Sequence, residues 1–244
     1  MRAYKYFHWV TAIFVTALIV SNIVAVKLIQ VGPFNLTAAV LIFSISYIFG
    51  DVLTEVYGYA RARQVIWIGF ACNLIAVIGF YSAGRLPPSP NWTLPGFDTP
   101  AAAQQAYDAL LGSTPLILVA SFAAYLAGEF LNSFVLAKLK LATRGRWLWV
   151  RTIGSTVVAQ VADTGIFVGI LVLGGLFPAS LALSIIAGEW LAKVSYEVLA
   201  TPLTYWVVNF LKRAENEDYY DWHTNFNPLT LREDSPAAPR LDTP

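Results

Sequence analysis

Residues 187–211 read AGEWLAKVSYEVLATPLTYWVVNFL, and this stretch is long and apolar enough to span a bilayer, since a crossing needs roughly 20 mostly apolar residues. It nevertheless contains Glu189, Lys193 and Glu197, whose spacing of four residues places them on one face of a helix. An unpaired ionised side chain at the bilayer centre costs roughly 3 kcal/mol or more. The charged face must therefore point into a polar interior, which makes it the first candidate for a binding site.

The composition of the whole chain is typical of a membrane protein. Of its 244 residues, 57% are hydrophobic and 13% are charged, whereas soluble proteins have about 25% charged residues. The net charge of +1 gives no indication of nucleic-acid binding. The single cysteine, Cys72, excludes an intrachain disulfide, and His8 and His223 are too far apart in sequence to indicate a metal site. We therefore expect neither a metal nor a cofactor.

Six apolar stretches predict an all-α membrane protein, a bundle of about six transmembrane helices. The first five are residues 9–29, 36–57, 64–83, 115–139 and 150–173. The sixth, 187–211, is expected to kink at Pro202 and to follow a short outer segment over 179–186. Read as one helix, 179–211 would be over-long for a hydrocarbon core roughly 30 Å thick.

Basic residues are distributed unevenly between the two sides of this predicted bundle. The side that carries the chain ends has eleven of them: Arg2, Lys5, Arg61, Arg63, Lys138, Lys140, Arg144, Arg146, Arg151, Lys212 and Arg213. The other side has two, Lys27 and Arg85. Because cytoplasmic loops carry an excess of Lys and Arg, we expect both termini to be cytoplasmic.

The polar segments divide the chain into a membrane domain over residues 1–213 and a cytoplasmic tail over 214–244. The last dozen residues of the tail, which include three prolines, are expected to be disordered. Between the third and fourth stretches, Asp98 or Thr99 followed by Pro100 predicts the start of a short interfacial helix on the outer face.

Polar side chains recur at membrane depth in five of the six stretches, often three or four residues apart and therefore on one helix face. The candidate substrate-binding residues are Asn22, Lys27, Asp51, Glu55, Glu129, Asn132, Gln160, Asp163, Glu189, Lys193 and Glu197. Gly128 allows a neighbouring helix to approach closely beside Glu129. Lys193 is the one cation in the middle of the membrane, so we expect it to neutralise one of the acids.

A structural role is the alternative for each of these residues. Asn22 can serve as a contact between helices, and Lys27 can extend to the membrane interface. Glu55 can pair with Arg61 and Arg63. The whole set could form a charge network that holds the bundle together, but a structural bundle rarely needs acids on four helices, so a functional site is favoured.

Several segments resemble the queuosine-precursor transporters, a family also grouped with vitamin-uptake transporters. They are SNIVAVKLI (21–29), YIFGDVLTEVYGYARAR (47–63), STVVAQVADTGIF (155–167), KVSYEVLATPLTYWVVNFLKRAE (193–215) and DYYDWHTNFNPL (218–229). The matching polar positions are Asn22, Lys27, Asp51, Glu55, Gln160, Asp163, Lys193 and Glu197, and the region of Glu129 matches more loosely.

The resemblance implies a bacterial inner-membrane protein that imports 7-cyano-7-deazaguanine or a related deazaguanine for tRNA modification. It also implies a helical fold similar to the substrate-binding subunits of energy-coupling-factor transporters. A carboxylate can accept hydrogen bonds from both the ring N–H and the exocyclic amine of such a ligand, and Asn, Gln or Lys can donate to its carbonyl. Aromatic faces for the ring are available from Phe43, Tyr47, Phe167, Trp190 and Tyr196.

Three hypotheses follow for the function. The first is a carrier that works alone. The second is a binding subunit that needs separate ATPase partners, because the chain has no phosphate-binding G-x-x-x-x-G-K-[ST] loop. The substrate could also be another purine-like or vitamin-like molecule, and a homo-oligomer is left open. The third hypothesis, an intramembrane enzyme or a structural bundle, has little support, because the chain has no H-E-x-x-H motif and no histidine at membrane depth.

Overall fold

The computed structural model describes residues 4–25, 27–31, 34–112, 115–175 and 178–230. Within these ranges the chain forms seven helices and one short β-hairpin. In chain order the elements are α1 (Phe7–Val24), β1 (Leu28–Val31), β2 (Phe34–Thr37), α2 (Ala39–Tyr57), α3 (Tyr59–Gly84), α4 (Pro100–Leu111), α5 (Pro115–Ala142), α6 (Leu148–Leu173) and α7 (Ala179–Glu215). The all-α membrane fold expected from the sequence is confirmed.

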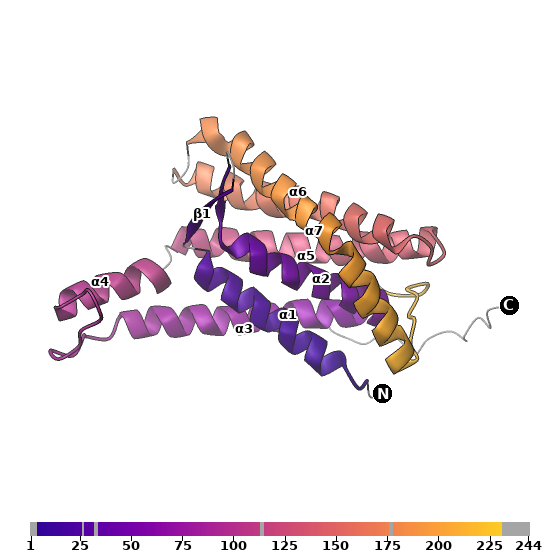
Figure 1. Cartoon of the computed structure of the whole chain (residues 1–244), viewed down its shortest axis with the longest axis horizontal. Helices are drawn as coiled ribbons and strands as arrows, with labels where there is room; N and C mark the ends of the chain where they lie inside the picture. The colour runs from indigo at the N-terminus through magenta and orange to yellow at the C-terminus, as the bar shows by residue number, and fades with distance from the viewer. Residues whose placement is uncertain (1–3, 26, 32–33, 113–114, 176–177, 231–244) are drawn as a thin grey trace.

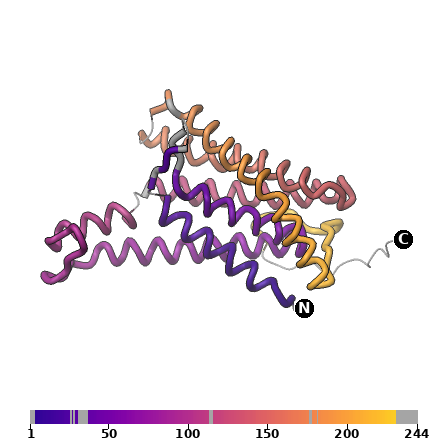
Figure 2. Tube along the Cα trace, in the orientation of Figure 1, coloured from indigo at the N-terminus to yellow at the C-terminus, as the bar shows by residue number. Residues whose placement is uncertain are grey.

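All helices except α4 run between the same two ends of the molecule (Figure 1). One end carries the start of α1, the end of α7, the turn between α2 and α3 and the turn between α5 and α6, and we call it the terminal side. The other end carries the hairpin, and we call it the hairpin side. The chain path in Figure 2 shows that α2 crosses the middle of this arrangement, and it contacts α1, α3, α5 and α7.

Five segments of the chain are long and apolar enough to cross a membrane by the described residues: Phe7–Val24, Ala39–Tyr57, Tyr59–Gly84, Leu148–Leu173, and a stretch within Pro100–Ala142, the range that holds the separate helices α4 and α5. The 37-residue helix α7 is not among them, since charged residues interrupt its apolar sequence. It packs along α6 and α2, and its exposed face carries large apolar side chains such as Leu199, Leu203 and Trp206. That α7 is the sixth crossing therefore stays a prediction, now supported by its position.

The structure corrects two predicted boundaries. The first apolar stretch was expected to stay helical to residue 29, but α1 ends at Val24 and Leu28–Val31 pairs antiparallel with Phe34–Thr37. The β-branched residues near this end suit either structure, which is why hydropathy alone did not separate them. The expected break between 179–186 and 187–211 is also wrong, because α7 is one continuous helix that includes Pro202.

The expected helix on the outer loop is present as α4. Thr99 caps it, since the Thr99 hydroxyl accepts a hydrogen bond from the backbone N–H of Ala102, and Pro100 occupies its first turn. The helix packs against the end of α3 on the hairpin side. Its outer location stays a prediction.

The first part of the C-terminal tail, residues 216–230, folds back against the terminal side of the bundle. The Asp221 carboxylate accepts hydrogen bonds from the backbone N–H of Tyr59 at the start of α3. The Arg63 side chain donates to the carbonyls of Asn225 and Asn227, and the Trp67 indole donates to that of Pro228. The predicted disorder of the last dozen residues concerns a region outside the described residues.

Candidate functional site

The centre of the bundle contains polar side chains from four helices, which together we call the polar cluster. Its members are Tyr47 and Asp51 of α2, Glu129 and Asn132 of α5, Thr156, Gln160, Asp163 and Thr164 of α6, and Lys193 and Glu197 of α7. All of them are buried except Lys193, which is mostly buried. On each helix they recur three, four or seven residues apart, so each helix presents one polar face inward.

Two contacts join these helices in pairs. The Asn132 amide donates a hydrogen bond of 2.6 Å to the Asp51 carboxylate, which links α5 to α2. The Lys193 ammonium forms an ion pair of 2.9 Å with the Asp163 carboxylate, which links α7 to α6. The sequence left open which acid Lys193 neutralises, and the structure assigns Asp163. The same ammonium lies 5.0 Å from the centre of the Phe43 ring, so it also makes a cation–π contact.

At Gly128, α5 lies close to both α2 and α6, as its sequence context indicated. A Cβ atom at this position would lie 2.8 Å from the Tyr47 hydroxyl and 2.9 Å from the Asp163 Cβ. The absence of a side chain there lets Tyr47 and Asp163 come together beside the neighbouring Glu129. Gly128 therefore helps to determine the shape of the cluster.

Nine buried polar atoms of the cluster have no hydrogen-bond partner within the described part of the chain. Six are acceptor oxygens: Asp51 Oδ2, Glu129 Oε1 and Oε2, Asn132 Oδ1, Gln160 Oε1 and Glu197 Oε1. Three are hydroxyls: Tyr47, Thr156 and Thr164. Leaving such a group buried and unpaired costs about 1–3 kcal/mol each, and native proteins contain few of them. Their recurrence on four helices that pack together makes the polar cluster the candidate binding site.

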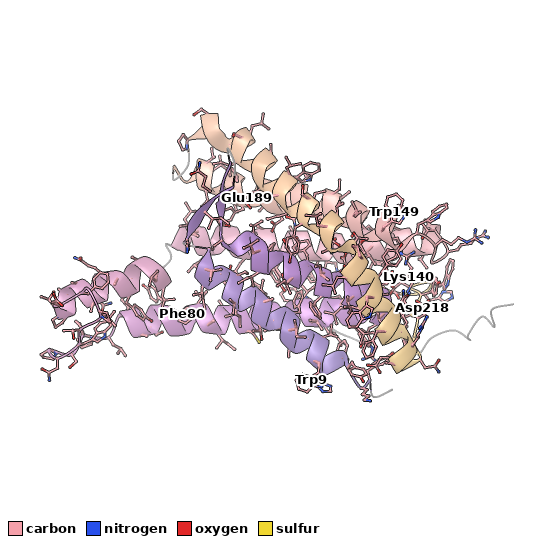
Figure 3. The ribbon with its side chains drawn as sticks, in the orientation of Figure 1. Trp9, Phe80, Lys140, Trp149, Glu189 and Asp218 are labelled. Atoms are coloured by element: carbon pink, nitrogen blue, oxygen red, sulfur yellow. The ribbon has the colours of Figure 1, made fainter. Side chains whose placement is uncertain are left out.

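Four of the predicted site residues lie outside the polar cluster: Asn22, Lys27, Glu55 and Glu189. Asn22 of α1 and Lys27 are exposed on the surface of the described chain. Glu189 is partly buried and lies on α7 toward the hairpin side (Figure 3). The structure therefore does not bring Asn22, Lys27 and Glu189 together with the other predicted residues.

Glu55 belongs to a separate ionic network at the terminal side. Arg151 of α6 donates to both of its carboxylate oxygens, at 2.7 Å and 3.1 Å, and Lys212 of α7 donates at 2.6 Å. Lys140 of α5 lies 3.5 Å from the same carboxylate. The structural alternative for Glu55, pairing with Arg61 and Arg63, is replaced in the structure by pairing with Arg151 of α6 and Lys212 of α7.

The tail adds Asp218 to this network. Its carboxylate accepts hydrogen bonds from Lys140 at 2.6 Å and forms an ion pair with Lys212 at 2.9 Å (Figure 3). Burial acts to raise the pKa of the Asp218 carboxyl, but Lys140 and Lys212 outweigh this effect and hold its pKa below the usual value. Glu55, Lys140, Arg151, Lys212 and Asp218 together form what we call the terminal network.

Comparison with known proteins decides the family. The family model described as "Putative vitamin uptake transporter" matches residues 37–207, a range that contains the whole polar cluster. The chain belongs to this family. It is therefore a membrane transporter and not an enzyme.

The transporter is also similar to a protein of Bacillus subtilis (strain 168) whose name is "Probable queuosine precursor transporter". The two are 28% identical over 190 residues, which covers 78% of this chain and 79% of the relative. No solved structure matches the transporter. The expected likeness to subunits of energy-coupling-factor transporters stays a prediction.

Sequence reasoning identified the acids of this transporter but missed other members of its two polar groups. Tyr47 was expected only as an aromatic face, yet its hydroxyl lies inside the polar cluster. Lys140, Arg151 and Lys212 were used only to orient the chain, yet all three contact Glu55. The positions of Arg151 at the start of α6 and Lys212 near the end of α7 were compatible with this pairing, but partners on different helices cannot be read from spacing.

Proposed function

We propose that this transporter imports a queuosine precursor, 7-cyano-7-deazaguanine or a related deazaguanine, across a bacterial inner membrane. The observation that carries the proposal is the group of nine unpaired polar atoms buried between α2, α5, α6 and α7. The name of the Bacillus subtilis relative supports this substrate class. Both termini face the cytoplasm in this proposal, in agreement with the excess of basic residues on the terminal side.

The chemistry of the unpaired atoms suits a ligand that is rich in hydrogen-bond donors. Six of the nine unpaired atoms are acceptor oxygens. Four of these six belong to the carboxyl groups of Asp51, Glu129 and Glu197, and the other two belong to the amides of Asn132 and Gln160. A deazaguanine offers the ring N–H groups and the exocyclic amine as donors, and a carboxylate such as Asp51 can accept two of them side by side. The hydroxyls of Tyr47, Thr156 and Thr164 can donate to the ligand carbonyl.

Aromatic side chains border the polar cluster and can hold a flat ring. The rings of Phe43 and Tyr47 lie 5.2 Å apart on α2, and Lys193 lies over Phe43. The Trp190 indole is fixed by a hydrogen bond of 3.1 Å to the Val157 carbonyl of α6. Acids, amides and aromatic rings around one buried region form a suitable environment for a purine-like molecule.

The structure corresponds to an occluded state in this proposal. The unpaired atoms of the cluster are shielded from solvent, so a ligand can enter or leave only after the helices move. On the cytoplasmic side, the terminal network joins α2, α5, α6, α7 and the tail. Separation of these charges would open the route from the polar cluster to the cytoplasm.

Uptake of radiolabelled 7-cyano-7-deazaguanine tests the proposal in bacterial cells that cannot make the precursor. Cells that express the transporter should accumulate the label and regain queuosine in their tRNA, while cells with an empty vector should do neither. Competition by unlabelled guanine, adenine and vitamins defines the substrate class. An expressed protein that transports one of these competitors, and not the deazaguanine, would contradict the proposed substrate.

A second experiment separates a carrier that works alone from a subunit of a larger complex. The sequence has no phosphate-binding loop for ATP, and we propose that the transporter acts as a secondary carrier. Uptake should therefore persist in a host that lacks the ATPases of energy-coupling-factor transporters. Loss of uptake in that host, with restoration when the ATPases are supplied, would assign the chain to the subunit class.

A further inference from the structure

We propose that Glu129 is the binding site for a coupling proton, so that import of the substrate is driven by the proton gradient. This inference rests on the proposed function and adds its energy source. The first observation is the environment of the side chain. Glu129 is 0% exposed, and neither carboxylate oxygen has a hydrogen-bond partner among the residues described.

The other acids near Glu129 differ from it, because none of them has both carboxylate oxygens buried without a hydrogen-bond partner in the described structure. Asp51 accepts a hydrogen bond from Asn132, and Asp163 is paired with Lys193. Glu197 lies beside Asp51 and has one shielded oxygen without a partner. Among the four acids, Glu129 therefore has the fewest contacts in the described surroundings that could stabilise its ionised form.

The charge balance of the polar cluster also favours a protonated Glu129. It contains four acids, namely Asp51, Glu129, Asp163 and Glu197, and one base, Lys193. With all groups ionised, the cluster would carry a net charge of −3 among side chains that are largely shielded from bulk solvent. An isolated buried carboxylate is so costly that it takes up a proton instead. At least one acid, Glu129 first, is thus expected to hold a proton in the occluded state.

The groups that face Glu129 supply no positive charge to replace that proton. They are Tyr47 and Asp51 of α2, Tyr125 of its own helix and Asp163 of α6. Around these lie Cys72 of α3 beside Tyr125, Glu197 of α7 beside Asp51, and Lys193 of α7 paired with Asp163. The Tyr125 hydroxyl already donates to the Ile66 carbonyl, and Lys193 is engaged by Asp163. The unpaired Tyr47 hydroxyl lies near Asp163 at Gly128 and remains available as a partner.

A proton fits this place better than a metal cation. In the described part of the chain, no group of three or more Asp, Glu, His or Cys side chains converges closely enough to hold a metal ion. The four acids of the cluster come one each from α2, α5, α6 and α7. A proton needs one carboxylate, whereas a cation needs several oxygens around one point.

The position of Glu129 on α5 connects the proton to the substrate. Asn132 is one helical turn away and holds Asp51, which we propose as a ligand-binding acid. Gly50, next to Asp51 on α2, would place a Cβ 3.2 Å from Glu129 Oε2. A shift of α5 against α2 would therefore change the environments of Glu129 and Asp51 together.

The proton step itself involves no other reactant. When the cluster opens outward, the Glu129 carboxylate takes a proton from the external water and becomes a neutral carboxylic acid. The helices can then close around the neutral site with its substrate. When the cluster opens inward, water solvates the carboxylate, and the proton passes to a water molecule on the cytoplasmic side. One proton moves inward with each substrate molecule.

Purified protein in liposomes tests the proposal with labelled 7-cyano-7-deazaguanine. A gradient of one pH unit, alkaline inside, should support accumulation of up to about tenfold in the wild type. A protonophore should abolish this accumulation. The Glu129→Gln variant should still exchange internal for external substrate, but it should not accumulate it. The Asp98→Asn variant, altered in the exposed outer loop, should behave like the wild type.

A measurement on the wild type alone covers the case in which Glu129→Gln does not fold. When substrate is added outside vesicles that have no imposed pH gradient, the interior of the vesicles should become more acidic, as a trapped pH-sensitive dye reports. No acidification, or accumulation driven by sodium alone, would overturn the proton proposal while the transport function stands. Full accumulation by Glu129→Gln would also overturn it. A wild type that neither exchanges nor accumulates the deazaguanine would contradict the proposed function itself.

Discussion

At the scale of single residues, the ion pair between Asp163 and Lys193 is the clearest case in which a side chain depends on a partner far along the chain. The two groups lie 2.9 Å apart, and their side chains are only 8% and 12% exposed. Removing one partner of such a pair leaves the other charge buried and uncompensated. Removing both leaves no stranded charge, so the two substitutions should not be additive.

We expect Asp163→Asn and Lys193→Met each to destabilise the purified transporter by about 3 kcal/mol, the lower end of the range for a stranded buried charge. The double variant should be more stable than either single variant. Thermal unfolding in one detergent measures all four proteins. Losses that simply add in the double variant would show that the two side chains do not stabilise each other.

Spacing within one sequence identified most of the charged residues in the polar cluster, because an ionised residue at membrane depth is costly and needs a polar environment. It could not identify the partner of Lys193, since contacts between helices depend on how the helices rotate and pack. The same limit explains Glu55, whose partners Arg151 and Lys212 come from α6 and α7. Asn22 differs from these residues, because it lies exposed on α1 and outside the polar cluster, and a role for it in substrate binding stays a prediction.

At the scale of elements, the tail over residues 216–230 completes the terminal side of the bundle. Tyr219 donates its backbone N–H to the Val56 carbonyl, and its ring occupies the space beside Gly58. Gly58 has a φ of +85°, a conformation that L-residues with a side chain rarely adopt. A side chain at position 58 would therefore meet both backbone strain and the Tyr219 ring.

Gly58→Ala should lower the thermal stability of the transporter and release the tail from the bundle. The matched control is Gly79→Ala in α3, where an added Cβ has nothing within 4 Å and where alanine favours the helix by about 0.5–1 kcal/mol. Limited proteolysis between residues 216 and 230 reports on release of the tail. Equal protection of both variants would contradict the proposed role of the tail contact.

Long apolar helices were the elements that the sequence predicted best, because their length and hydropathy are set by the bilayer. The outer helix α4 was also predicted, since the Thr99–Pro100 pair is a local capping signal. The hairpin was not predicted, because hydropathy alone does not separate its strand residues from the apolar helical stretches beside them. The docked tail was not predicted either, because contacts with segments distant in sequence order its residues. Arg63 illustrates this, as it holds the carbonyls of Asn225 and Asn227.

At the scale of the whole molecule, the arrangement requires an even number of crossings. The start of α1 and the end of α7 lie on the same side, and the loop that contains Pro95 lies on the other (Figure 1). With α7 as the sixth crossing, reporters fused near Pro95 and after Pro228 should show opposite locations, the second being cytoplasmic. Reporters on the same side would contradict the six-span topology.

The central claim is that the polar cluster binds the transported molecule, and Asp51 tests it most directly. One oxygen of Asp51 is held by Asn132 and the other is buried without a described partner, so Asp51→Asn removes the charge and keeps the internal contact. Loss of one charge-assisted hydrogen bond costs about 1.5–3 kcal/mol, which corresponds to a roughly tenfold to hundredfold weaker affinity.

The measurement is equilibrium binding of 7-cyano-7-deazaguanine to the wild type, Asp51→Asn and the loop control Asp98→Asn in lipid nanodiscs. Thermal unfolding of each sample verifies that the proteins are folded. We predict that Asp51→Asn folds and binds about tenfold to hundredfold more weakly, while Asp98→Asn binds like the wild type. Wild-type affinity in folded Asp51→Asn would contradict the assignment of the binding site.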